Sequence, residues 1–305
     1  MVMDSLIQFT QRFATVEACL EHLQAVRWAD GAYCPHCGGA DRIYHYSDGR
    51  RHKCGECQRT FRLITGTIFA DSPIKLLPKW FAAIWLDTCH AKGISSVQLA
   101  KDIGVTQKTA WHMLQRIRHA AGNDASGMLG GTVEVDETYI GGKEKNKHAS
   151  KRTEGTQGRS TKTKTVAFGI TERGGDTRAF TVEGAAVRHV MPHVLRNVAL
   201  GSTVNADEHR GYSALDGFYA LERVNHGRGE YVRGKTHTNT VEGFWALVKR
   251  AYVGIHHHWT KKHSQRYLDG CAYRLNCRRM GRADRVTRLI GRGIGVRLPY
   301  KVLTQ

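Results

Sequence analysis

Three carboxylates, Asp136, Asp207 and Glu242, are the residues of this sequence best suited to chemistry on phosphate groups. Asp136 lies within a strand-like run at residues 133–140, and Asp207 ends a second strand-like run. Glu242 begins an amphipathic stretch that is typical of a helix. Because the chain carries a formal net charge of +19, we expect it to bind polyanions. Carboxylates gathered on such a chain would hold divalent metal ions against phosphate, which is the chemistry of cutting and joining DNA.

The expected roles of these carboxylates follow from the preference of Mg²⁺ for oxygen ligands. Two Mg²⁺ or Mn²⁺ ions would activate the attacking oxygen and stabilise the leaving oxygen of an in-line displacement. We expect Asp136 to bridge both ions, and Asp207 and Glu242 to bind one each. Lys249 lies two helical turns after Glu242, on the same helix face, and would contact DNA phosphates. Asn239 lies one turn before Glu242 and is a second candidate for a metal ligand or a substrate contact.

Other residues compete with this assignment. Glu134, Glu137 and Glu208 are carboxylates beside the chosen aspartates, and Glu134 ranks lower because nothing around it in the sequence distinguishes it. A single aspartate at a strand end is more often a turn or capping residue. The histidine run 256–258 is more typical of a solvated or DNA-facing cluster than of a metal site.

A second group of residues has the spacing of metal ligands: Cys34, Cys37, Cys54 and Cys57. Each pair is spaced C-x-x-C, and two such pairs place four thiolates tetrahedrally around zinc. Four thiolates leave no open coordination position, so this Zn²⁺ would be structural and would supply folding energy to a small module. The other four cysteines are interpreted as buried thiols: Cys19, Cys89, Cys271 and Cys277.

Length and composition indicate the class of protein. A chain of 305 residues with 41% apolar residues is globular and has two or three domains. A pI near 9.8 favours nucleic acid or another acidic partner. No basic segment with an apolar core opens the chain, and no apolar run is long enough to span a bilayer, so neither secretion nor membrane insertion is expected. We therefore expect a cytoplasmic, nucleoid-associated protein without disulfides.

The pattern along the chain predicts a multidomain protein of the α+β and α/β classes. An N-terminal helix (1–30) precedes the zinc ribbon (31–65) and a helical module (70–121). From residue 132 the pattern changes to three strands, a helix and a fourth strand, which is the order of an RNase-H-like fold. We assign this catalytic domain to 132–285 and a C-terminal tail to 286–305. In such a fold the strand of the first aspartate is central, and the strand of the second pairs beside it in parallel.

Residues 95–111 resemble a helix-turn-helix. Ser95 caps a short helix, Gly104 makes the turn, and Thr106 caps the second helix. In the DNA-binding interpretation, the second helix enters the major groove. Its outward-facing residues would be Gln107, Lys108, His112, Gln115 and Arg116. The alternative is a three-helix packing unit without DNA contact.

Basic segments outside this helix are further candidates for contact with the DNA backbone. The stretch 143–164 has almost no apolar residues and is expected to be a mobile loop, which is either merely solvated or clamps DNA. For the zinc ribbon, a DNA-contact role and a purely architectural role stay open. The candidate DNA-binding residues are Lys53, Arg59, Arg62, Lys143, Lys145, Lys151, Arg152, Lys249 and Arg250.

Taken together, these motifs resemble bacterial insertion-sequence transposases of the ISXO2-like group, which carry an N-terminal zinc ribbon. The resemblance covers nearly the whole chain and includes the segments VDETYIGGK (135–143), DEHRGY (207–212) and HTNTVEGFW (237–245). It implies a DDE-type transposase whose first two catalytic positions are Asp136 and Asp207. The third position of the family is either Asn or Glu. We choose Glu242 over Asn239 because Lys249 follows Glu242 at the spacing of DDE-type enzymes.

The resemblance also implies the substrates and the assembly. The ribbon and helical module would recognise the terminal repeats of the element, and the catalytic domain would cut a strand at each end and join the freed 3′-hydroxyl to target DNA. Because two ends must be held together, we expect at least a homodimer on double-stranded DNA. Two alternatives are a regulator with an inert C-terminal domain and an RNase-H-like nuclease or resolvase that cuts without joining.

Overall fold

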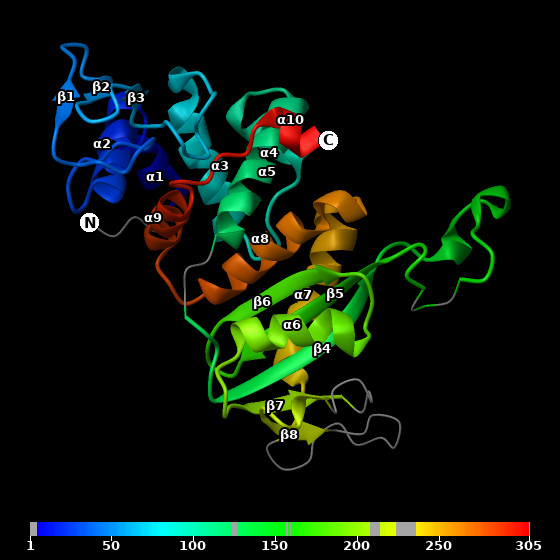
Figure 1. Ribbon diagram of the computed structural model, residues 1–305. Helices are drawn as coiled ribbons and strands as arrows, with labels where there is room; N and C mark the ends of the chain where they lie inside the picture. The colour runs from blue at the N-terminus through cyan, green and yellow to red at the C-terminus, as the bar shows by residue number, and fades with distance from the viewer. Residues whose placement is uncertain are drawn as a thin grey trace. The chain divides into compact units, whose positions relative to one another are not determined.

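The chain forms two compact units (Figure 1). The computed structural model describes residues 5–123, 127–156, 158, 160–207, 214–223 and 236–304. The first unit combines Met1–Asp124 with Arg279–Gln305, and the second is the continuous segment Ala125–Arg278. The second unit is therefore inserted between two parts of the first. Within the described part of the chain, no helix combines the length and apolarity needed to cross a bilayer.

The first unit begins with two helices where the sequence predicts one. Helix α1 spans Leu6–Arg12 and helix α2 spans Val16–Arg27. The side chain of Thr15 accepts a hydrogen bond from the backbone N–H of Ala18, which gives α2 its own N-cap. The apolar spacing continues across this break, so it conceals the boundary within the predicted helix 1–30.

Three short strands follow and form an antiparallel sheet of order β1-β2-β3. They are β1 (Ile43–His45), β2 (Arg51–Cys54) and β3 (Thr60–Arg62). The small core beside them contains Cys34, Cys54 and Phe61, with Trp28, Ile43 and Cys57 packed at its edge. Half of this core consists of cysteines that have metal-ligand spacing, so the module has little apolar core of its own.

Three helices complete the N-terminal part of the first unit. They are α3 (Leu77–Cys89), α4 (Ser96–Ile103) and α5 (Gln107–Gly122). Gly104 has a φ of +61°, the left-handed conformation that ends α4, and Thr106 caps α5 through its side chain. The angle between α4 and α5 is therefore set by a turn of three residues, 104–106.

The C-terminal segment belongs to this first unit, which differs from the predicted tail at 286–305. Helix α9 (Arg282–Arg292) packs against α2, α3 and α5 and buries Val286, Leu289 and Ile290. A short helix, α10 (Tyr300–Thr304), buries Leu303. The boundary of the second unit consequently lies at residue 278 rather than at 285.

The second unit is built on a five-stranded sheet of order β6-β5-β4-β7-β8. The central strand β4 (Thr132–Ile140) pairs antiparallel with β5 (Thr165–Glu172), which pairs antiparallel with β6 (Thr177–Val182). On its other side, β4 pairs in parallel with β7 (Thr203–Ala206), and β7 with β8 (Ala220–Arg223). The parallel pairing of β4 with β7 agrees with the prediction, whereas β8 was not predicted.

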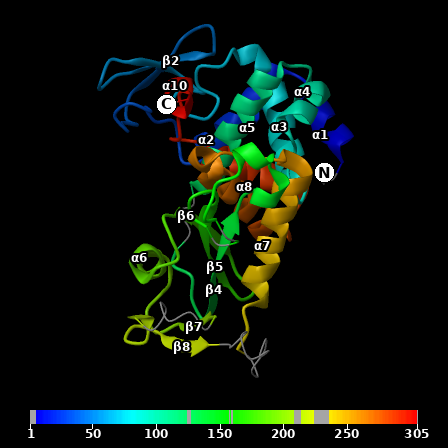
Figure 2. The ribbon, with the colours of Figure 1, turned by 90° about the vertical axis from the view of Figure 1, so that its right-hand side faces the viewer.

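Helices cover both faces of this sheet (Figure 2). Helix α6 (Val187–Asn197) lies on one face, and α7 (Asn239–Ala251) and α8 (Ser264–Asn276) lie on the other. One apolar core, which includes Phe168, forms under α6. A second, which includes Trp245, forms under α7 and α8. Because successive strand residues point to opposite faces, β4 and β5 contribute to both cores.

Candidate active site

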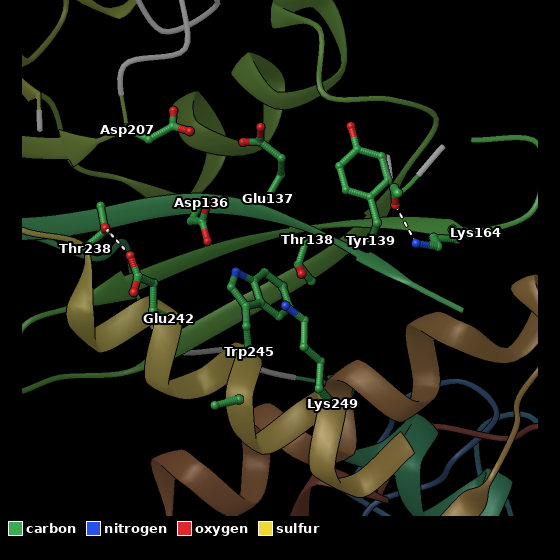
Figure 3. Close-up of a pocket in the computed structure, with 12 residues that line it drawn as sticks. Asp136, Glu137, Thr138, Tyr139, Lys164, Asp207, Thr238, Glu242, Trp245 and Lys249 are labelled. Atoms are coloured by element: carbon green, nitrogen blue, oxygen red, sulfur yellow. Dashed lines mark hydrogen bonds between the residues drawn. The ribbon is translucent and has the colours of Figure 1, made fainter. Parts of the chain in front are cut away.

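The three carboxylates singled out in the sequence line one cavity of about 650 Å³ in the second unit (Figure 3). Asp136 is on β4, Asp207 directly follows β7, and Glu242 is in the first turn of α7. The other described residues that line the cavity are Glu137, Thr138, Tyr139, Gly158, Lys164, Thr238, Trp245, Ala246 and Lys249. The fold therefore brings together carboxylates that lie far apart in the sequence.

The register of the sheet places the two aspartates at neighbouring positions. Glu134 on β4 is the partner of Asn205 on β7, across a parallel pair of strands. Asp136 and Asp207 each lie two residues further along their strands. Because side chains two residues apart point to the same face of a sheet, Asp136 in the middle of β4 and Asp207 just after β7 point to the same face.

Helix α7 brings Glu242 to the cavity because it packs very closely on the sheet. Gly169 on β5 is the register partner of Asp136. A Cβ atom at Gly169 would lie 2.6 Å from Cζ2 of Trp245, so only glycine lets this indole lie against the strand. The hydroxyl of Thr238 donates to Oε1 of Glu242 at 2.8 Å and so orients the carboxylate (Figure 3).

Crowded negative charge dominates the electrostatics of the cavity. The pKa of Asp136 is raised from 3.8 to about 8, mainly by burial. The negative charges of Glu137, Asp207 and Glu242 contribute to this rise in pKa. Each charged neighbour disfavours ionisation of Asp136, because like charges in a poorly solvated cavity repel. A cation bound among these carboxylates would offset that repulsion.

Two lysines line the same cavity. Lys249 is on α7, and Lys164 lies at the end of the basic stretch, where its Nζ donates to the carbonyl oxygen of Gly158. Arg250 and Asn239 are exposed and lie outside the described lining of the cavity. Of the two candidates for the third ligand, Glu242 is thus the one at the cavity.

The other predicted DNA-binding residues outside α5 lie at or near the surface. All four in the basic stretch are exposed: Lys143, Lys145, Lys151 and Arg152. The guanidinium of Arg152 donates to the carbonyl oxygens of Lys147 and Lys145 at 3.1 and 3.0 Å, which folds this part of the stretch back on itself. In the ribbon, Arg59 and Arg62 are exposed and Lys53 is half-buried.

Two of the predicted contact residues on α5 are buried instead. Arg116 is 2% exposed, and its guanidinium donates to the carbonyl oxygens of Leu298 and Ile68 at 3.0 and 2.9 Å. Gln115 is also fully buried. The prediction that these two side chains face outward, with Arg116 on DNA, is therefore wrong: the buried guanidinium holds other segments of its own unit. The remaining three are exposed or half-buried: Gln107, Lys108 and His112.

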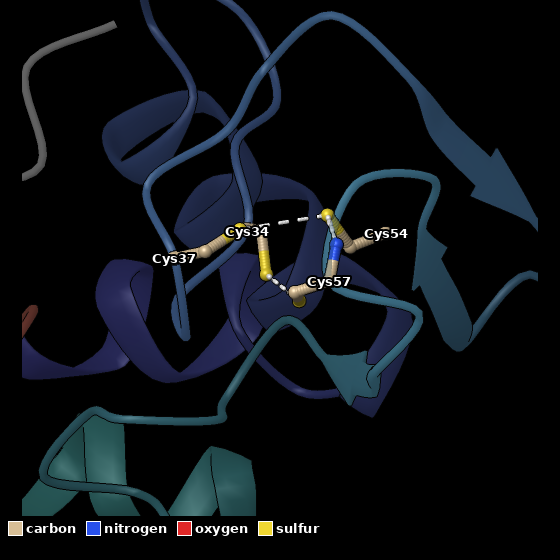
Figure 4. Close-up of side chains that lie close together, drawn as sticks. All are labelled: Cys34, Cys37, Cys54 and Cys57. Carbon is tan, nitrogen blue, oxygen red and sulfur yellow. Dashed lines mark hydrogen bonds between the residues drawn. The ribbon is translucent and has the colours of Figure 1, made fainter.

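The four cysteines of the ribbon converge on one point (Figure 4). Their Sγ atoms all lie within 4.8 Å of one another. The Sγ atoms of Cys34 and Cys57 are 3.6 Å apart, as are those of Cys37 and Cys54. Four sulfurs around a tetrahedral zinc, each about 2.3 Å from the metal, would be about 3.8 Å apart. The cluster therefore fits a structural zinc ion.

Sequence reasoning missed the residues that support the cavity from beneath. Glu134 is fully buried, yet its Oε2 accepts hydrogen bonds from the backbone N–H groups of Thr240 and Val241. Arg173 lies 2.7 Å from its Oε1. The one signal in the sequence is a glutamate inside an apolar central strand, because a buried charge requires a partner. Glu208, with the rest of the segment 208–212, lies outside the described residues.

Comparison with known proteins places the chain in a family. Residues 128–276 match the ISXO2-like transposase domain, and residues 15–60 match a transposase zinc-ribbon domain. The chain is 33% identical over 240 residues to an uncharacterized protein in transposable element ISH50 of Halobacterium salinarum, a match that covers 75% of this chain and 80% of that protein. No solved structure matched the chain. The chain therefore belongs to the ISXO2-like transposases and carries a transposase zinc-ribbon domain in its N-terminal part.

Proposed function

We propose that this protein is a DDE-type DNA transposase, which cleaves a strand at each end of its element and joins the freed 3′-hydroxyl to target DNA. The observation that carries the proposal is the convergence of Asp136, Asp207 and Glu242 on one cavity that also holds two lysines. Carboxylate oxygens suit Mg²⁺ or Mn²⁺, and lysine suits the phosphate backbone. Membership of a transposase family supplies DNA as the substrate class.

The cavity residues have distinct roles in this proposal. Two divalent ions, when bound, would activate the attacking water or 3′-hydroxyl and stabilise the leaving oxygen. Asp136, Asp207 and Glu242 would together hold these ions. The neighbouring negative charges that help to raise the pKa of Asp136 would also attract a divalent cation, which must displace the proton of Asp136 when it binds. Lys249 and Lys164 would hold the phosphates on either side of the reacting bond.

The sheet supports an RNase-H-like catalytic domain. Its central first strand β4 has two antiparallel neighbours in series on one side and two parallel strands on the other. The two aspartates leave adjacent parallel strands, and a helix packed on the sheet supplies the third carboxylate. Apart from β8, these strands follow the order of elements that the sequence predicts.

The first unit supplies the proposed DNA-recognition surface. Helices α4 and α5, joined by a tight turn, are consistent with a helix-turn-helix, and Gln107 and Lys108 are exposed at the start of α5. The exposed Arg59 and Arg62 of the ribbon are further candidates for DNA contact. Two element ends must be held at once, so a dimer with one catalytic site per subunit is the proposed working state.

The test uses purified full-length protein, labelled DNA with the sequences that flank the gene, and Mg²⁺ or Mn²⁺. We expect metal-dependent 3′-end cleavage and strand joining, which Asp136→Ala abolishes. A matched pair of variants assigns the third ligand: Glu242→Gln is expected to lose both steps, whereas Asn239→Ala retains them. The reverse result would move the third ligand to Asn239.

Two other outcomes would replace the proposal. Tight, specific DNA binding without cleavage by the unmodified protein would identify a regulator and contradict the role of the carboxylates. Cleavage without any joining, on branched DNA in preference to element ends, would identify a nuclease or resolvase. Paired element ends in one protein complex would support the dimer, and complexes with a single subunit only would contradict it.

A further inference from the structure

Two buried polar residues lie directly beneath the catalytic aspartates. Glu134 and Asn205 are register partners across β4 and β7, and each lies two residues before one of the aspartates. Each therefore points to the same face of the sheet as the aspartate that follows it. Their exposed fractions are 0% and 2%. Burial of an apolar side chain at these positions would carry no desolvation penalty, so the buried polar groups require a structural reason.

Glu134 caps the N-terminus of α7 from a different segment of the chain. Its Oε2 accepts from the backbone N–H groups of Thr240 and Val241 at 2.7 and 3.1 Å, and its Oε1 accepts from the hydroxyl of Thr240 at 3.0 Å. The side chain of Thr238, at the N-cap position of α7, makes no capping hydrogen bond. First-turn N–H groups have no partner within a helix, and a carboxylate there also interacts favourably with the helix dipole.

Further contacts tie the segment before α7 to the other strands. Arg173 follows β5, and its Nε lies 2.7 Å from Oε1 of Glu134. The same guanidinium donates to the carbonyl oxygen of His237 at 2.9 Å. Asn205 donates to the same carbonyl at 3.2 Å. The start of α7 is thus bonded to β4, to β7 and to the end of β5 at once, and the charge of the buried carboxylate is paired.

We propose that Glu134 is a positioning residue of the active site, which fixes the start of α7, and thereby Glu242, relative to Asp136 and Asp207. The apolar contacts under α7 are not directional, so by themselves they permit small shifts of the helix along the sheet. Charge-assisted hydrogen bonds to the first-turn amides are directional and set its position. A carboxylate displaced by about 1 Å would bind a shared metal ion poorly and could cost about a hundredfold in rate. The proposal rests on the proposed metal-dependent function.

The experiment compares full-length Glu134→Gln with Val194→Ala, a control that loosens α6 on the opposite face of the sheet. Glu134→Gln removes the charge but nearly keeps the shape, and Thr240→Val is a milder variant that removes only the hydroxyl contact. The readouts are the affinity for Mn²⁺ alone, by paramagnetic resonance, and amide hydrogen exchange at Thr240 and Val241.

We expect Glu134→Gln to weaken Mn²⁺ binding by about 10- to 100-fold and to speed exchange at both amides. Thr240→Val should act in the same direction with a smaller change. Val194→Ala should lower the melting temperature while Mn²⁺ affinity stays unchanged. The turnover rate with DNA should fall in Glu134→Gln. The KM for DNA should stay unchanged, because the residue lies beneath the cavity and does not line it.

Three results separate the possible failures. If Glu134→Gln keeps Mn²⁺ affinity and amide protection, Glu134 does not position α7. If Val194→Ala weakens Mn²⁺ binding as much, the effect is general destabilisation, which also overturns the proposal. If the unmodified protein binds no Mn²⁺ but Glu134→Gln still loses amide protection, the positioning of α7 stands and the proposed metal-dependent function fails.

Discussion

The two groups of proposed metal-ligand residues in this protein are built in opposite ways. The four cysteines lie within residues 34–57: one pair is at a turn before β1, and the other is at the turn between β2 and β3. The three carboxylates come from a central strand, from the end of its parallel neighbour and from a helix far along the chain. Local spacing encodes the first group, whereas the second depends on sheet register and helix packing. A site of the second kind needs residues beneath it that hold its parts together.

The two groups also differ in what they contribute to folding. Half of the small core of the ribbon consists of the cysteines themselves, so removal of a metal there would leave it with few stabilising contacts. The second unit has an apolar core on each face of its sheet, and neither depends on the carboxylates. We therefore expect the ribbon to fold only with its metal, and the second unit to fold without one.

Zinc removal should produce the largest effect, because binding energies of structural zinc are about 10 kcal/mol or more. We expect Cys54→Ser, or a chelator, to abolish hydrogen-exchange protection over residues 51–62 while the strands of the second unit keep theirs. Cys89→Ser, which changes a thiol of the same unit outside the cluster, is the control. A ribbon that stays protected without zinc would remove the contrast between the two sites.

Gly169→Ala tests the packing on which the carboxylate site depends. The added Cβ would meet Trp245 at 2.6 Å and push α7 away from the sheet. We expect a loss of about 1–3 kcal/mol in stability and a larger proportional loss of metal-dependent cleavage. Gly243→Ala, on α7 itself, meets nothing within 4 Å and should be neutral or slightly stabilising. Equal effects of the two variants on cleavage would contradict the close approach as the cause.

Asp269→Asn should have the smallest effect. It tests whether a carboxylate with a raised pKa, outside the cavity, lowers the stability of the second unit. Burial raises the pKa of Asp269 from 3.8 to about 7, against the hydrogen bond from Gln265 and the charge of Arg266. The native state therefore holds the proton more tightly than the unfolded chain. The stability associated with this proton is complete below pH 4 and is lost as the pH rises through 7.

Replacement by Asn, which still accepts a hydrogen bond from Gln265, should raise the free energy of unfolding at pH 8 by on the order of 1 kcal/mol. The melting temperature at pH 8 should rise accordingly. The variant and the unmodified protein should converge near pH 4. Thermal unfolding across this pH range measures the difference, and equal curves at pH 8 would show that this carboxylate carries no cost.

The sequence predicts the features that depend on neighbouring residues. The cysteine cluster is confirmed, because two C-x-x-C pairs can hardly be arranged otherwise. The strands of both aspartates and their parallel pairing also follow, since apolar alternation and element order indicate them. Catalytic roles for Asp136, Asp207 and Glu242 stay predictions, although the three residues line one cavity.

The features that were missed depend on distant partners. Arg116 is buried because acceptor carbonyls from two other segments surround it, and its neighbours in the sequence do not show this. Glu134 is buried for the same kind of reason, since its partners lie 39 to 107 residues further along the chain. The predicted tail at 286–305 misses helix α9, in which the arginines outnumber the three apolar residues that the helix buries.

The insertion of the second unit between α5 and α9 has a genetic consequence. A stop codon or frameshift directly after codon 278 would leave the whole sheet and its three carboxylates in the translated product. It would also delete α9, and with it Val286, Leu289 and Ile290, from the core of the first unit, which carries the ribbon. A gene copy that lost only its last codons would thus encode every proposed catalytic residue and still make a defective protein, through damage to the unit at the opposite end of the reading frame.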